Sequence, residues 1–212
     1  MPEPGTISVV GHGRAVGAPD VCRARLMSSA LRPSVAAALA DSEAAIRLVR
    51  DALAAHGVPP GDAVTSTVSV QAEQDWSGQR GPRPLGYRAE HILEIVLRDL
   101  GAAGRVLGAA VGAGGDTVRL QGLTFGVEDD SELRAGARAG AWEDALAAAG
   151  QVAELAGRRL GAVRGVEQRS EGGPPVRPRI TPAAGMAAAP EIGLEPGDVA
   201  VDVWLAVVWE LD

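Results

Sequence analysis

The chain has 212 residues, of which 46% are hydrophobic, so a core can form without help from disulfides or a structural metal. Its formal net charge is -7, and its 20 basic residues are all arginines that form no basic run. An acidic chain of this kind is a poor candidate for nucleic-acid binding, and the absence of lysine excludes a P-loop, a Schiff base and a Ser-Lys dyad.

The N-terminal residues lack both the basic segment and the apolar segment of a signal peptide. No apolar run approaches the ~20 residues that span a bilayer. We therefore expect a soluble protein without a membrane span. On this sequence it is expected to be cytoplasmic, or periplasmic or secreted if a leader was trimmed.

Residues 7–16 and 21–30 alternate between apolar and polar side chains, and a Pro-containing turn at 18–20 joins them. The alternation predicts two strands, and the short connection favours a hairpin. The first strand contains the run Gly-His-Gly at 11–13. Because another strand follows, and not the helix that a dinucleotide-binding loop requires, we interpret these glycines as a bulge or bend.

The segment 33–57 repeats apolar residues at helical spacing and predicts an amphipathic helix. A half-buried strand is predicted at 64–72, followed by a Gly- and Pro-rich loop at 77–84. The side chains of residues 86–98 then alternate along one long predicted strand. The face formed by its odd-numbered residues is apolar except for His91. We expect the rest of the protein to pack against that face.

The second half of the chain begins with a predicted helix at 100–114 and a strand at 117–127. A long helix is predicted from residue 131, where aspartates supply capping groups, and a short strand at 162–169. The last strand, 199–211, is apolar at every odd position and partly apolar at the even ones. This pattern indicates a strand with neighbours on both sides.

Residues 171–197 are crowded with Pro, Gly and Ala and lack periodic apolar residues, which predicts an extended excursion. Together the elements predict an α+β fold, with a mainly antiparallel sheet packed by two or three helices. Their order is ββαββαβαβ-loop-β. We expect a single domain over residues 6–212.

Short motifs mark the boundaries of several predicted strands. They are Ile7–Gly13 with Ala18–Asp20, Gly86–Ala89, Gly122–Gly126, and Glu195–Asp198 followed by a Val-rich strand that ends in Trp209–Leu211. In order and spacing these motifs resemble the SIMPL domain family, over nearly the whole chain. The resemblance implies a bacterial protein, often periplasmic or secreted, without an agreed biochemical activity. Some members are linked to oxidative-stress defence or to large self-assemblies. The family has no established catalytic residues, so none is carried over, and no cofactor is expected.

The histidines His12 and His91 lie in predicted strands. If those two strands were neighbours, both rings and a carboxylate such as Asp202 could approach the geometry of a metal or small-ligand site. The sequence contains no short His-x-x-x-His spacing that would bring them together, so a hydrogen-bonded or interface histidine is the favoured interpretation.

Cys22 is the only cysteine, and it alternates with two arginines that could lower the pKa of its thiol. It shares a strand face with Ala24 and Leu26, however, which favours a buried, unreactive side chain. A thiol antioxidant is therefore the less favoured alternative. The Gly-x-Ser-x-Gly elbow of hydrolases is absent, and we do not expect an enzyme.

Three tryptophans, Trp204, Trp142 and Trp76, fall outside the main apolar stripes or in a loop. Exposed aromatic residues are typical of protein interfaces. The leading hypothesis is therefore a non-enzymatic protein that self-associates into a homo-oligomer, with Trp204 as the best interface candidate. The alternative is a small-ligand or metal-binding protein that uses the strand histidines.

Overall fold

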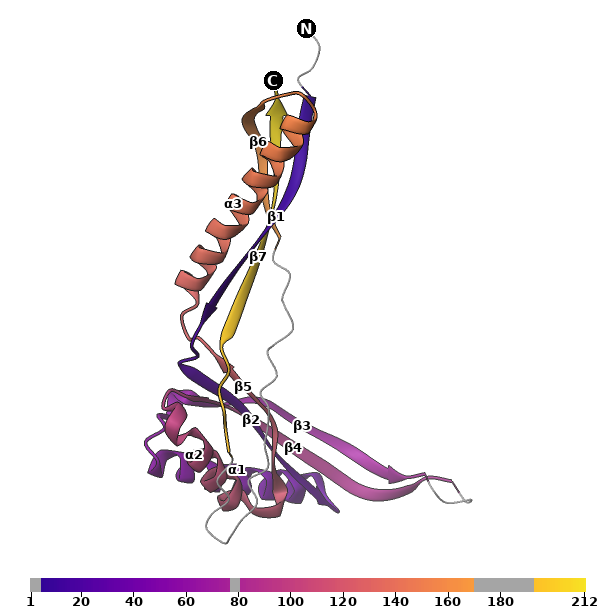
Figure 1. Cartoon of the computed structure of the whole chain (residues 1–212). Coiled ribbons are helices and arrows are strands. Elements are labelled where there is room, and N and C mark those ends of the chain that lie inside the picture. The colour runs from indigo at the N-terminus through magenta and orange to yellow at the C-terminus, as the bar shows by residue number, and fades with distance from the viewer. Residues whose placement is uncertain (1–4, 77–80, 170–192) are drawn as a thin grey trace. The chain divides into compact units, whose positions relative to one another are not determined.

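A computed structural model describes residues 5–76, 81–169 and 193–212 of the chain (Figure 1). The described residues form two compact units. The first unit contains residues 5–19, 127–169 and 198–212, and the second contains the remainder. Each unit has its own antiparallel sheet covered by helix, which confirms the predicted α+β class and element order. The predicted strands are, however, divided between two sheets.

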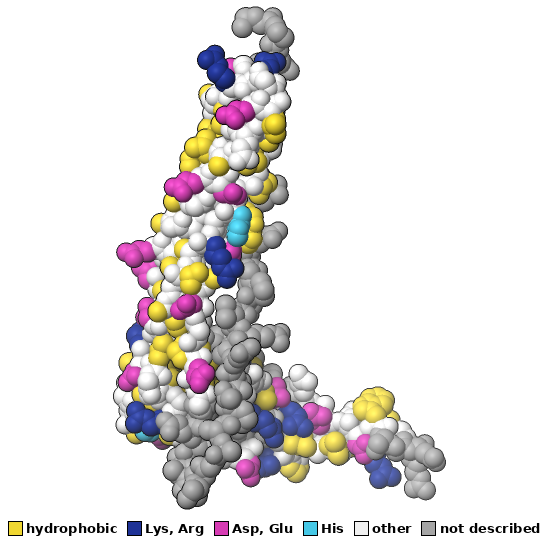
Figure 2. All heavy atoms as spheres, viewed as in Figure 1, with side chains coloured by type: hydrophobic (Ala, Val, Ile, Leu, Met, Phe, Trp, Pro, Cys, Tyr) yellow, Lys and Arg dark blue, Asp and Glu magenta, His cyan; other side chains and the backbone are white. Residues whose placement is uncertain are grey.

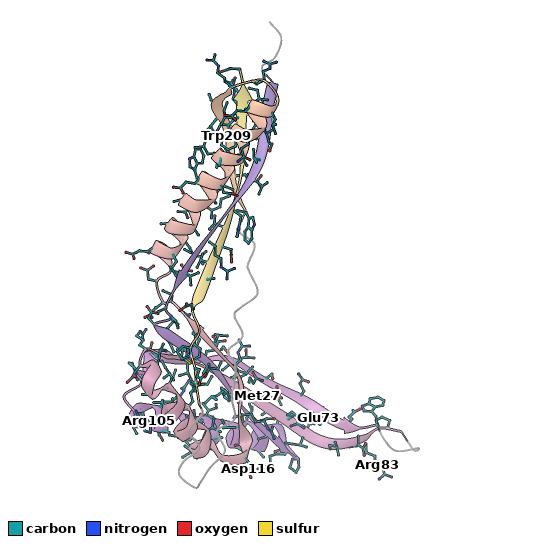
Figure 3. All side chains as sticks on the ribbon, in the orientation of Figure 1. Met27, Glu73, Arg83, Arg105, Asp116 and Trp209 are labelled. Carbon is teal, nitrogen blue, oxygen red and sulfur yellow. The ribbon has the colours of Figure 1, made fainter. Side chains whose placement is uncertain are left out.

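The first unit is a three-stranded antiparallel sheet with one helix. Its strands have the order β1-β7-β6, and the unit consists of β1 (Gly5–Gly17), α3 (Ser131–Leu155), β6 (Leu160–Arg169) and β7 (Val199–Leu211). As predicted, β7 has a neighbour on each side. Its odd positions face α3, and Trp209 on this face is buried in the core of the unit (Figure 3).

Helix α3 packs against β1 with almost no side-chain layer between them. The buried residues of α3 are all alanines at four-residue spacing, and β1 presents Gly11 and Gly13 to them. A Cβ at Gly13 would lie 2.0 Å from the carbonyl oxygen of Ala137, and one at Gly11 would lie 2.1 Å from that of Ala141. The predicted bulge is wrong, because the register with β7 runs without interruption. The glycines instead let two backbones approach each other.

The second unit is a four-stranded antiparallel sheet with the order β3-β4-β2-β5. Its elements are β2 (Val21–Arg32), α1 (Val35–Ala55), β3 (Ala63–Asp75), β4 (Arg83–Leu97), α2 (Leu100–Gly114) and β5 (Val118–Gly126). Both helices are capped at their N-termini, because Ser34 and Asp99 accept hydrogen bonds from backbone N–H groups of the first turns. The helices pack against the strand face that carries Leu26, Leu93 and Ile95.

The expectation that the rest of the protein packs against the long strand β4 holds only for the second unit, since the first unit has a separate core. The predicted hairpin of β1 and β2 is also wrong. β1 pairs with β7, whereas β2 pairs with β4 and β5. The turn at 18–20 therefore carries the chain from one sheet to the other.

The Pro-, Gly- and Ala-rich segment predicted at 171–197 lies outside the described residues up to position 192. Its last residues, 193–197, have no regular secondary structure before β7 begins. Within the described part of the chain, the helices are all too short or too polar to cross a membrane.

Candidate functional site

The sheet of the first unit has one face that α3 does not cover. Side chains alternate along its strands, so the even positions of β1 and β7 point away from the helix. Val10 and Val16 on this face are 51% and 53% exposed. On the same face, β7 contributes Trp204, Ala206 and Val208, all half-buried. We call this surface the open β1–β7 face.

Strand register places His12 directly opposite Trp204, and Arg14 opposite Asp202, at the middle of this face. The His12 ring stacks on the indole of Trp204, with centroids 4.9 Å apart and planes inclined by 27°. Its Nε2 lies 2.8 Å from Oδ1 of Asp202, and the Arg14 guanidinium lies 3.9 Å from the same oxygen. These four residues form a compact group that we call the His12 cluster. Figure 2 shows a histidine beside basic, acidic and hydrophobic side chains on this unit.

The main chain of His12 is held as well. Its N–H donates a 2.9 Å hydrogen bond to Oδ2 of Asp144 on α3. This N–H lies on the edge of β1 that no described strand pairs with, so the aspartate occupies part of an otherwise open sheet edge. The close packing of α3 on the β1 glycines places Asp144 within reach. Sequence reasoning identified His12, Asp202 and Trp204 but missed Arg14 and Asp144.

The chemistry of the cluster is that of a fixed, amphipathic surface. The carboxylate of Asp202 offsets positive charge from Arg14, and the stacked rings present a flat aromatic area. Among the described residues no three His, Cys, Asp or Glu side chains converge as a metal site would require. Two of the three ligand candidates, His12 and Asp202, do meet, and their contact is a hydrogen bond.

The third ligand candidate, His91, lies on β4 of the other sheet, between Ser28 of β2 and Val68 of β3. The condition for the histidine site, that its two strands be neighbours, is therefore not met. The Nδ1 atom of His91 is buried without a hydrogen-bond partner among the described residues. Burial lowers the pKa of this ring, an effect that Glu43 opposes and Arg50 reinforces. His91 thus belongs to the packing between β4 and the helical layer.

Cys22 is fully buried in the core of the second unit. Loss of solvation raises the pKa of its thiol to about 11. Because the thiolate is the reactive form, a thiol held neutral in the core is a poor nucleophile at physiological pH. The arginines beside it in sequence point to the opposite face of β2 and do not offset this effect.

The other two interface candidates differ in their surroundings. Trp142 on α3 is half-buried, tilted against the buried Trp209 at a centroid distance of 6.0 Å. It lines a groove of about 610 Å³ together with Val166 and Leu205. Trp76 follows the end of β3 and is 74% exposed, the most open of the four tryptophans. Of the three candidates, Trp204 is the one that stacks on a hydrogen-bonded polar residue, His12.

Two antiparallel sheets, each covered by helix, define an α+β protein. Comparison with known families identifies the family: the sequence model of SIMPL, described as a protein of unknown function (DUF541), matches residues 7–209. The chain therefore belongs to the SIMPL family. The match extends across both structural units. The search of curated proteins found no matching relative.

Proposed function

We propose that this SIMPL protein is non-enzymatic and self-associates, and that copies meet through the open β1–β7 face. The observation that carries the proposal is the stacked pair of His12 and Trp204 at the centre of a partly apolar, uncovered sheet face. Tryptophans held in a fixed orientation are frequent hot spots of protein interfaces, because they bury a large area at little entropic cost.

Two features favour the face of the sheet over its β1 edge as the contact surface. The edge is partly occupied by Asp144, which accepts the outward N–H of His12. On the face, Asp202 is already engaged within one copy, through its hydrogen bond with His12 and its ion pair with Arg14. A second copy can therefore cover the face without leaving a buried charge unpaired, which is the costly alternative.

The non-enzymatic part of the proposal draws support from Cys22. A thiol antioxidant needs an accessible thiolate, whereas this thiol is buried and its pKa is raised to about 11. A link to stress defence, which the family resemblance suggests, would then depend on assembly and not on thiol chemistry.

The test is molar mass in solution, measured by light scattering during size-exclusion chromatography over a dilution series. We expect the parent protein to have a mass of at least twice 21.6 kDa at high concentration. Trp204→Ser should raise the dissociation constant by more than about tenfold, as loss of a hot-spot aromatic does. The matched control is Leu48→Ser, which removes an exposed leucine from α1 in the other unit and should leave the mass unchanged.

Near-UV circular dichroism of the buried Trp209 verifies that the variant keeps its fold. Should Trp204→Ser lose that signal, Val10→Ser probes the same face at a residue outside the His12 cluster. A parent that stays at 21.6 kDa at all concentrations refutes self-association. An effect of Trp76→Ser or Trp142→Ser without one of Trp204→Ser would place the interface elsewhere.

A further inference from the structure

The sheet of the second unit also has an uncovered face, and this face is hollowed. The depression lies on the side opposite α1 and α2, the side to which Met27 points (Figure 3), and it has a volume of about 790 Å³. This volume falls in the range of small-molecule sites, roughly 300–1,000 Å³. Its lining includes Arg23, Arg25, Val64, Glu94, Val96 and Thr124.

Two β-bulges border the depression at the same level of the sheet. In β3 the register with β4 shifts around Ser66, and in β5 the register with β2 shifts around Gln121. Both side chains bond to groups on the open face, Ser66 to Glu94 and Gln121 to the sulfur of Met27 at 2.9 Å. Bulges bend strands and re-aim side chains, and they are frequent next to binding sites.

Most charges around the depression are neutralised within the unit. Arg25 donates a 2.7 Å hydrogen bond to Glu94, and Arg98 pairs with Asp62 at 2.5 Å. The hydrogen bonds from Arg25 and Ser66 lower the pKa of Glu94, so this carboxylate stays ionised and keeps its arginine engaged. Neither pair leaves a net charge to attract a ligand.

Arg23 is the exception. It lies two residues from Arg25 on the same face of β2, about 7 Å along the strand. Its cross-strand neighbours are Thr124 on β5 and Val96 on β4, which carry no charge. Among the described residues no carboxylate forms an ion pair with Arg23. Its exposed guanidinium therefore stands at one end of the depression, against Gly126, on the sheet face that also carries Thr124 and the apolar side chains of Val96 and Val64.

We propose that this depression binds a small organic anion with an apolar body. Arg23 and the Thr124 hydroxyl would hold the anionic group, and the body would lie along Val96 and Val64. A single unpaired cation suits a singly charged carboxylate, since Arg binds such groups in a planar, two-point geometry. At Glu94 the arginine, Arg25, is already engaged by the carboxylate, so a ligand placed the other way round finds no free cation there. This site lies wholly in the second unit and does not depend on the open β1–β7 face.

The test uses hexanoate as the probe and backbone amide NMR of the ¹⁵N-labelled full chain as the readout. We expect hexanoate to shift the resonances of Gly122, Thr124 and Val96, whereas acetate and hexan-1-ol bind at least about tenfold more weakly. Arg23→Gln should weaken hexanoate binding at least about tenfold, as loss of a charge-assisted hydrogen bond does. Arg119→Gln is the matched control. It removes the same charge from the same sheet face, outside the lining of the depression.

Three results would overturn the proposal. Hexanoate that causes no shifts at a concentration of tens of millimolar shows that the depression does not take this class of ligand. Equal losses in Arg23→Gln and Arg119→Gln show a general charge effect. Shifts confined to the first unit place the binding elsewhere. The mass of the protein in solution is measured separately, so failure here leaves the self-association proposal standing.

Discussion

Both units pack helix on an antiparallel sheet, but the side chains between helix and sheet differ in size. In the first unit the buried residues of α3 are all alanines, and β1 meets them with glycines at backbone contact distance. In the second unit, branched side chains such as Ile46, Leu93 and Leu107 fill a thicker layer between the helices and the strands. The contact between α3 and β1 therefore has no room for an added side chain at Gly11 or Gly13, whereas the second core depends on the side chains that fill it.

The largest effect is expected from Gly13→Val in the first unit. The new Cβ would lie 2.0 Å from a carbonyl oxygen of α3, and a backbone atom within a helix has little freedom to move away. The cost should exceed the roughly 3 kcal/mol of ordinary overpacking and separate α3 from the sheet. Three of the four tryptophans lie in this unit, so loss of the near-UV tryptophan signal measures the effect.

The control for this variant is Gly165→Ala, on β6 of the same sheet. A Cβ at that position meets no atom within 4 Å, so stability should change by less than about 1 kcal/mol. If both substitutions proved equally harmless, the direct backbone packing of α3 on β1 would be wrong.

A smaller loss is expected from Leu93→Ala, which removes atoms from the second core. Leu93 is fully buried on β4, opposite Leu26 of β2. Deleting a buried leucine side chain to alanine costs about 2–5 kcal/mol, depending on how far the cavity collapses. Methyl NMR of the second unit during urea unfolding measures the loss. Ile92→Ala, on the open face of the same strand, should cost clearly less, and equal costs would contradict the assignment of faces.

Local physics accounts for what the sequence predicts well. Residues close in the chain determine where the helices start, at Ser34 and Asp99, and how side chains alternate along β4 and β7. The element order and the α+β class are therefore recognisable from the sequence. Strand pairing depends on contacts between distant segments. The sequence pattern of β1 is equally consistent with β2 or β7 as its partner, which is why the hairpin prediction failed.

The candidate sites show the same limit. His12, Asp202 and Trp204 are recognisable as unusual residues on apolar strands, but only the β1–β7 register shows that they touch. Arg14 carries a weak signal, because it lies two residues from His12 on the same face. The depression around Arg23 depends on bulges in β3 and β5, which pair with different neighbours. No local sequence pattern predicts it.

The smallest effect is expected from Cys22, which lies in the second core and makes the stability of that unit depend on pH. The folded thiol has a pKa of about 11, against an ordinary value of 9.0. Between these values the unfolded chain releases the thiol proton while the folded chain retains it, so the free energy of unfolding falls as pH rises from 9 to 11. The loss should be at most about 2 kcal/mol, since burial effects on a single thiol are partly relieved by relaxation. Urea unfolding of the parent and of Cys22→Ala at several pH values measures it. Above pH 9 the free energy of unfolding of the parent should fall relative to that of Cys22→Ala. If the two free energies change in parallel with pH up to 11, the thiol is solvated in the folded protein.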